Sequence, residues 1–137
     1  METVVIDASV LIKWFVNEIK SDSAIKIRDQ YIKGEVNLMA PNLILYEVLN
    51  ALKYIKLHNQ DEVEEIFEII INYGIELFTL NKELVNKSLE IAMKSKLTLY
   101  DSTYVALANI KEGKLVTADE KLLINTPKEY EKNVKIL

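Results

Sequence analysis

Four acidic residues stand at positions that exposure to solvent does not explain. Asp7 and Asp119 each follow a short apolar run that suits a buried strand, whose interior cannot hold a carboxylate. Asp101 opens a helix of apolar character, and Glu47 lies within the apolar stripe of another helix. Because a carboxylate on a buried face needs a partner or a shifted pKa, these four residues are the candidates for metal binding and catalysis.

The expected positions of the four acids converge. In an open α/β sheet, the carboxyl ends of parallel strands and the amino ends of the following helices share one edge. Asp7, Asp101 and Asp119 are expected there, and Glu47 reaches it from the amino-terminal half of its helix. Four carboxylates at close range would raise one another's pKa values, so the cluster predicts a compensating cation. The chain has no cysteine and one histidine, His58, which we interpret as an exposed helix-terminal residue; the oxygen ligands therefore predict Mg²⁺ or Mn²⁺ rather than zinc.

Each acid also has a structural interpretation. Asp7, Asp101 and Asp119 each suit the N-cap position of a helix, for which aspartate is among the preferred residues. Glu47 is harder to explain in this way, because its predicted face is apolar. It could make a structural hydrogen bond or an ion pair with Lys13 or another lysine.

Carboxylate-bound Mg²⁺ is typical of phosphoryl chemistry, in which the ion polarises the phosphate and lowers the pKa of the attacking water. The sequence has no Gly-rich phosphate loop, so the substrate's own phosphodiester is expected to complete the coordination. This combination predicts a nuclease. Ser9 and Thr117 each stand two residues from a strand-end aspartate and could orient a water, a carboxylate or the substrate phosphate. Alternatively, they are capping or turn hydroxyls.

Apolar periodicity predicts strands that alternate with helices, which implies βαβ units and a mainly parallel sheet. Strands are expected at residues 4–6, 36–40, 75–80, 115–118 and 134–137. Helices are expected at 10–16, 22–33, 41–57, 61–72, 81–96, 101–113 and 120–124. Pro41 is predicted at the first position of its helix, and residues 84, 85, 88, 89, 92 and 93 are predicted as a buried stripe. Without an internal repeat or linker, residues 1–137 are expected to form one domain.

Composition bounds the location and the partners. The 137 residues, half of them hydrophobic, suffice for one substantial core. The absence of cysteine, of a basic and apolar leader and of a long apolar run predicts a cytoplasmic protein with no signal peptide and no membrane span. A net charge of −4 argues at first against a nucleic-acid partner. If the four acids neutralise a cation, however, the other charges balance, and lysines could form a local basic face; Arg28 is the one arginine.

The motifs around the four acids resemble those of the PIN-domain family, and in particular the VapC-type ribonuclease toxins of bacterial and archaeal toxin–antitoxin pairs. The chain begins with V-V-I-D-A-S, which contains Asp7. Three later motifs are P-N-L-I-L-Y-E-V-L-N-A-L around Glu47, L-T-L-Y-D-S-T-Y-V-A-L-A around Asp101 and L-V-T-A-D-E-K-L around Asp119. Each motif is weak alone, but four in the family's order are quite specific, and together they span essentially the whole chain.

The resemblance implies a three-layer α/β/α fold with a mainly parallel central sheet. It also implies that the four acids bind the metal and that Ser9 and Thr117 occupy the family's hydroxyl positions. The expected activity is Mg²⁺- or Mn²⁺-dependent cleavage of RNA by an endoribonuclease. The resemblance further implies a homodimer and inhibition by a cognate antitoxin protein that inserts a segment at the acidic site.

Two other interpretations stay open. The first is a catalytically weak PIN-like module that retains the acidic pocket but acts by binding RNA or a protein. The second is an aspartyl-nucleophile phosphatase, which also begins with an apolar strand ending in aspartate. That chemistry expects a second aspartate two residues later, where this chain has Ser9. The four intact acids favour the ribonuclease, because a binding module has no evident need for all of them.

Overall fold

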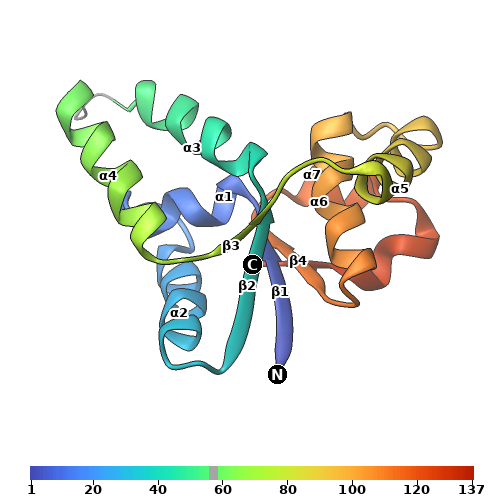
Figure 1. The fold of residues 1–137 in the computed structure, drawn as a ribbon, viewed down its shortest axis with the longest axis horizontal. Helices are drawn as coiled ribbons and strands as arrows, with labels where there is room; N and C mark the ends of the chain where they lie inside the picture. The colour runs from blue at the N-terminus through green and yellow to red at the C-terminus, as the bar shows by residue number, and fades with distance from the viewer. Residues whose placement is uncertain (56–58) are drawn as a thin grey trace.

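The computed structural model describes residues 1–55 and 59–137. Within these ranges the centre of the fold is a parallel sheet of five strands in the order β3-β2-β1-β4-β5 (Figure 1). The strands are β1 (Glu2–Ile6), β2 (Val36–Pro41), β3 (Glu76–Phe78), β4 (Lys114–Thr117) and β5 (Val134–Ile136). The mainly parallel sheet predicted from the alternation of strands and helices is therefore confirmed.

Helices cover the sheet from two sides. In Figure 1, α1 to α4 lie to one side of the central strands and α5 to α7 to the other. The helices are α1 (Ala8–Leu11), α2 (Ser21–Ile32), α3 (Leu43–Lys53), α4 (Gln60–Asn72), α5 (Lys82–Met93), α6 (Leu99–Ile110) and α7 (Glu120–Asn125). Two short 3₁₀ helices, η1 (Ile12–Trp14) and η2 (Lys128–Asn133), complete the connections. The arrangement confirms the expected three-layer α/β/α class.

The apolar sequence of β1 explains why it is the central strand. Val5 and Ile6 are fully buried. Both neighbouring strands pair with β1, so that Val5 lies opposite Met39 of β2 and Leu115 of β4. A strand with neighbours on both edges and helices on both faces favours β-branched apolar residues throughout. Asp7, the first residue after β1, therefore leaves the sheet at its middle.

The strand order places a topological switch point between β1 and β4. From β1 the chain moves outward to β2 and β3, then returns to β4 on the other side of β1 and continues to β5. The connections that follow β1 and β4 therefore diverge, and we refer to the region above the carboxyl ends of these strands as the crevice. Open α/β sheets bind their ligands at such a crevice. Asp7 follows β1 directly, and Asp119 follows β4 after one intervening residue.

The core of the molecule is built around β1, β4 and α6. Every residue of α6 from 102 to 108 is buried. The helix contacts β1, β2 and β4 of the sheet and packs against α5. A helix that is covered around most of its circumference is a core element, which explains its apolar sequence. Side chains at the start of α6 are thus anchored to the best-packed part of the fold.

The prediction that Pro41 begins a helix is wrong. Pro41 is the last residue of β2 and pairs with Phe78 of β3, and α3 begins at Leu43. Proline is tolerated at this strand end because the N–H of Asn42 donates to the carbonyl oxygen of Phe78, at 2.9 Å. The same helix was expected to run to residue 57 but ends at Lys53. Residues 56–58, and with them the interpretation of His58, lie outside the described residues.

The expected buried stripe of α5 is only partly correct. The residues of α5 that are buried are spaced as one narrow stripe, Leu84, Ser88 and Ile91. Of the other expected members, Ala92 is half-buried and the rest turn toward solvent, because α5 rests mainly on α6 and has a single buried face. The large apolar side chains exposed on this helix are Val85, Leu89 and Met93.

We predict that Gly113→Ala destabilises the fold by about 3 kcal/mol, near the upper end of the usual cost of overpacking. A Cβ atom at Gly113 would lie 2.5 Å from the backbone carbonyl oxygen of Thr3 in β1, an atom that cannot rotate away. Gly34→Ala is the control, because a Cβ there meets no atom within 4 Å and the cost of the left-handed conformation (φ 75°) is about 1 kcal/mol. Urea unfolding measures both, and equal losses would contradict the prediction.

Candidate active site

Asp7 is a buried carboxylate held by three hydrogen bonds. Its side chain is 7% exposed, and it is the N-cap of α1, where Oδ1 accepts from the N–H of Val10 at 3.3 Å. Oδ1 also accepts from Ser9 Oγ at 2.5 Å, and Oδ2 accepts from Thr117 Oγ1 at 2.5 Å. Burial raises the pKa of Asp7 above its usual value, while these hydrogen bonds oppose that shift. The N-cap interpretation of Asp7 is therefore correct, and it leaves the carboxylate in a fixed orientation.

The hydroxyls of Ser9 and Thr117 connect the ends of β1 and β4. Each donates to one oxygen of Asp7 and accepts a backbone N–H from the turn after β4. Ser9 Oγ accepts from Ala118 N at 2.9 Å, and Thr117 Oγ1 accepts from Asp119 N at 3.1 Å. The two hydroxyls therefore lock Asp7 to the neighbouring strand across the switch point.

Glu47 lies on α3, half-buried, and its partner is a tyrosine. The hydroxyl of Tyr104 in α6 donates to Glu47 Oε1 at 2.5 Å. Lys13, suggested by the sequence as an ion-pair partner for Glu47, instead pairs with Glu18 at 2.9 Å. Burial first, and then the neighbouring Glu47, raises the pKa of Tyr104 above its usual value, so the phenol remains a neutral donor.

The sequence analysis missed Tyr104. The signal that could have found it is its spacing from Asp101, since residues three apart on a helix share a face. A tyrosine on a buried helix face also needs a hydrogen-bond partner for its hydroxyl. An acid predicted on an apolar face, such as Glu47, is a natural acceptor.

Asp101 lies in the first turn of α6 and does not cap it. The N-cap is Thr98, whose Oγ1 accepts from the N–H of Asp101 at 3.1 Å, so the N-cap interpretation of Asp101 is wrong. Burial, followed by the charges of Glu47, Asp119 and Asp7, raises the pKa of Asp101 to about 6. A carboxylate that responds to all three other acids must share their neighbourhood.

Asp119 is the most exposed of the four acids. It is the N-cap of α7, where Oδ1 accepts from the N–H of Lys121 at 3.0 Å, so its capping interpretation is correct. A capping role does not exclude a ligand role, because the second carboxylate oxygen can still face the crevice. Asp119 lies at the rim of the acidic edge, whereas Asp7 lies at its floor.

The four acids have the oxygen ligands that a divalent cation needs, although their side chains do not converge on a single coordination site. In residues 1–55 and 59–137 no three histidine, aspartate or glutamate side chains come close enough together to hold a metal ion. All four acids are nevertheless carboxylates, which hard cations such as Mg²⁺ prefer. Burial is the main cause of the raised pKa values of Asp7 and Asp101, and neighbouring acids add to it; a bound cation would favour the charged form of both carboxyl groups.

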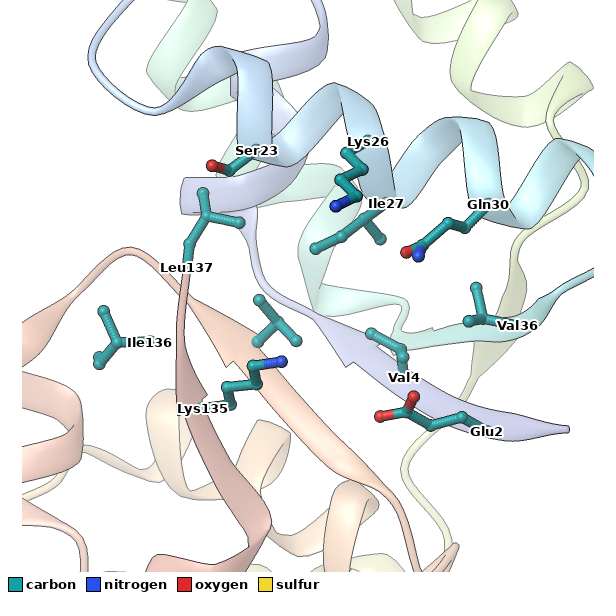
Figure 2. Close-up of a pocket in the computed structure, with 11 residues that line it drawn as sticks. Glu2, Val4, Ser23, Lys26, Ile27, Gln30, Val36, Lys135, Ile136 and Leu137 are labelled. Atoms are coloured by element: carbon teal, nitrogen blue, oxygen red, sulfur yellow. The ribbon is translucent and has the colours of Figure 1, made fainter.

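A separate hollow lies between α2 and the sheet (Figure 2). Its volume is about 260 Å³, and Lys26 and Lys135 line it together with Glu2, Gln30 and apolar side chains of the sheet. None of the four acids borders this hollow. The acidic edge is thus distinct from it, at the carboxyl ends of β1 and β4.

Among the parts of the chain that the structure describes, no helix is both long enough and apolar enough to cross a membrane. The longest helix, α4, has 13 residues, whereas a membrane-spanning helix needs roughly 20.

The chain is similar in sequence and in fold to known proteins. Ribonuclease VapC3 of Pyrobaculum aerophilum is 31% identical over 130 residues, which cover 90% of this chain and 94% of that protein. Among solved structures, a toxin–antitoxin complex from Klebsiella pneumoniae gives a TM-score of 0.67 at 16% identity, covering 96% of this chain and 95% of that one. Mycobacterium tuberculosis VapC20, a toxin that cleaves the sarcin–ricin loop, gives 0.68 at 13% identity, covering 87% and 92%.

Because the two solved structures are only 16% and 13% identical to this chain, their similarity shows a shared fold alone. The sequence evidence is stronger, because the PIN domain family matches residues 4–128, which contain the four acids and all of the sheet except the first two residues of β1 and the last strand. Together with the relative that is 31% identical over nearly its whole length, this match shows that the chain belongs to the PIN domain family.

Proposed function

We propose that this protein is a divalent-metal-dependent endoribonuclease and the toxin component of a VapC-type toxin–antitoxin pair. The observation that carries the proposal is the placement of four acids beside the switch point, where burial first, and then the charges of the other three, raises the pKa of Asp101 to about 6. The relative that matches almost the whole chain is named as a VapC ribonuclease, which supports the same activity.

In this proposal Asp7, Glu47, Asp101 and Asp119 hold one or two cations, Mg²⁺ or Mn²⁺. When bound, the metal would neutralise the acids, polarise the phosphodiester and lower the pKa of the attacking water. Because the side chains are spread along the crevice, some of them must turn toward a common point to share an ion. The exposed Asp119 and the half-buried Asp101 are the acids with room to turn.

The protein groups have separate tasks. Ser9 and Thr117 fix the carboxylate of Asp7, so that one ligand is oriented before the substrate arrives. Asp101 must lose its proton to serve as a ligand, and its raised pKa places that loss near pH 6. Asp119 stands at the exposed rim, where a phosphodiester entering the crevice would arrive first.

We expect a polymeric substrate to bind across the acidic edge. The elements that border this edge are α1, α3, α6 and α7 (Figure 1). Without a phosphate-binding loop, the contacts to RNA would come mainly from lysines, because Arg28 is the sole arginine of the sequence. The four acids would then be the only part of the contact surface that needs a cation.

The proposed partners are a cognate antitoxin and a second copy of this chain. An arginine or lysine of an antitoxin placed among the acids would replace the charge of the metal and block the site. A homodimer would cover apolar side chains that monomers rarely leave in water, at or beside α5. These side chains are Leu80, Val85, Leu89 and Met93. The proposed location is the cytoplasm.

We predict that the purified protein cleaves a panel of structured RNAs in the presence of Mn²⁺ or Mg²⁺, and that a chelator abolishes cleavage. Asp7→Asn is expected to lower the rate at least about 100-fold, because it removes a charged ligand that the fold orients. Gel analysis of the RNA products measures both effects.

The matched control for the cleavage experiment is Asp61→Asn, which removes an acid from the exposed face of α4, away from the crevice. This variant should cleave like the wild type. If the wild type binds RNA but cleaves none of it, the nuclease proposal is wrong and the RNA-binding module is the better interpretation.

We predict that millimolar Mn²⁺ raises the melting temperature of the wild type by about 3 °C or more, because an ion that binds only the folded acids stabilises them by mass action. Asp7→Asn should lose most of this shift, whereas Asp61→Asn should keep it. The absence of a shift in the wild type would argue against a folded metal site.

Asp101→Asn is expected to be at least as stable as the wild type above pH 6 without metal. The pKa of Asp101 is raised from 3.8 to about 6 in the fold, so the folded state binds a proton more tightly than the unfolded state between these values. The contribution of Asp101 to the stability of the wild type therefore falls as the pH rises from 4 to 6 and is level above that. The advantage of the variant should disappear near pH 4 in melting experiments, and a clear loss of stability at pH 7.5 would contradict this account.

A further inference from the structure

One hydrogen bond joins the two sides of the acidic crevice. Tyr104 of α6 is 1% exposed, and its hydroxyl donates to Glu47 Oε1 of α3 at 2.5 Å. The two residues are 57 positions apart in the sequence, and their helices lie on different sides of the central strands (Figure 1). The contact therefore fixes the position of a proposed ligand with a side chain that does not itself face solvent.

Tyr104 stands on a helix that is buried and packed on several sides. It belongs to the run of buried residues 102–108 in α6, which packs against both the sheet and α5. It also stands one turn after Asp101, on the same face of the helix. One rigid helix thus carries a proposed ligand, Asp101, and the donor that holds a second one, Glu47.

A glutamate side chain has three rotatable bonds, so a free Glu47 would sample many positions. The hydrogen bond from Tyr104 restricts it and occupies Oε1, which leaves Oε2 as the oxygen that can turn toward the crevice. We infer that Tyr104 is a positioning residue that sets the orientation of Glu47 for the divalent cation. This inference rests on the proposed function, because it requires that Glu47 is a metal ligand.

The contrasting role for Tyr104 is structural, a clamp between α3 and α6 with no effect on metal. The two roles differ in what the loss of the hydroxyl changes. A positioning residue alters the concentration of metal needed, since the loss of a group that orients a ligand costs about 10- to 100-fold in metal affinity. A clamp alters the melting temperature of the metal-free protein and leaves the metal affinity as it was.

The test is Tyr104→Phe, which removes one oxygen from a buried ring and keeps its shape. The matched control is Tyr130→Phe, because Tyr130 is also buried and its hydroxyl also donates to a glutamate, Glu90, at 3.1 Å. Glu90 is not one of the four acids of the crevice, so the loss of the Tyr130 hydroxyl removes no contact with a proposed metal ligand. Mn²⁺ is titrated against each protein, first with the shift in melting temperature as the readout and then with RNA cleavage.

Tyr104→Phe should raise the Mn²⁺ concentration at half-maximal shift by about 10- to 100-fold. Its cleavage rate should recover toward the wild-type value as Mn²⁺ is increased, whereas Tyr130→Phe should match the wild type throughout. Combining Tyr104→Phe with Glu47→Gln should cost no more metal affinity than Glu47→Gln alone, because the tyrosine acts through that side chain.

The outcomes separate this inference from the proposed function. If the wild type binds Mn²⁺ and cuts RNA but Tyr104→Phe has the same metal midpoint, the inference is overturned and the nuclease stands. If the wild type shows no metal-dependent shift, the metal site and the role of Tyr104 both fall. If Tyr104→Phe does not fold, Tyr104→Met, which also lacks the hydroxyl, is titrated instead, and additive effects with Glu47→Gln would equally overturn the inference.

Discussion

The burial of the Asp7 carboxylate is the constraint on which the rest of the site depends. A charged group at the end of the central strand costs free energy unless hydrogen bonds satisfy it, and three donors do so here. Two of these donors, Ser9 and Thr117, are themselves fixed by amides of the turn after β4. Side-chain and backbone hydrogen bonds therefore hold one buried carboxyl group in a fixed orientation, as a group that binds a cation requires.

Topology turns this local arrangement into a common site. The order β3-β2-β1-β4-β5 opens the crevice between β1 and β4, and the turns after these strands carry Asp7 and Asp119. The helices on the two sides add one acid each, Glu47 from α3 and Asp101 from α6. Four segments far apart in the sequence thus contribute acids to one edge. Burial, and then the charges of the other three acids, raises the pKa of Asp101, as expected for carboxyl groups that lie near one another.

Much of this could be predicted from the sequence because the signals are local. Strands of β-branched residues, caps such as Asn81 and the alternation of strands and helices follow from patterns of a few residues. The conclusion that the acids share an edge needed only the rule for parallel sheets. The motifs added the family, which the comparisons bear out.

The features that could not be predicted depend on contacts between distant segments. The partner of Glu47 is Tyr104, 57 residues away; the spacing of Tyr104 from Asp101 indicates a shared helix face but not the contact with α3. Pro41 fits a helix start equally well until the pairing of β2 with β3 is known. The outer side of α5 is as apolar in sequence as its buried stripe, so burial could be assigned only once α6 was in place.

The central claim is that a divalent cation binds between the turns after β1 and β4, and a crystal grown with Mn²⁺ tests it most directly. An anomalous difference map at the manganese edge should show a peak within coordination distance of Asp7 and of at least one other acid, Glu47, Asp101 or Asp119. Ordered Mn²⁺ at other places on the molecule, with Asp7 still bonded to its hydroxyls and no peak beside it, would contradict the account.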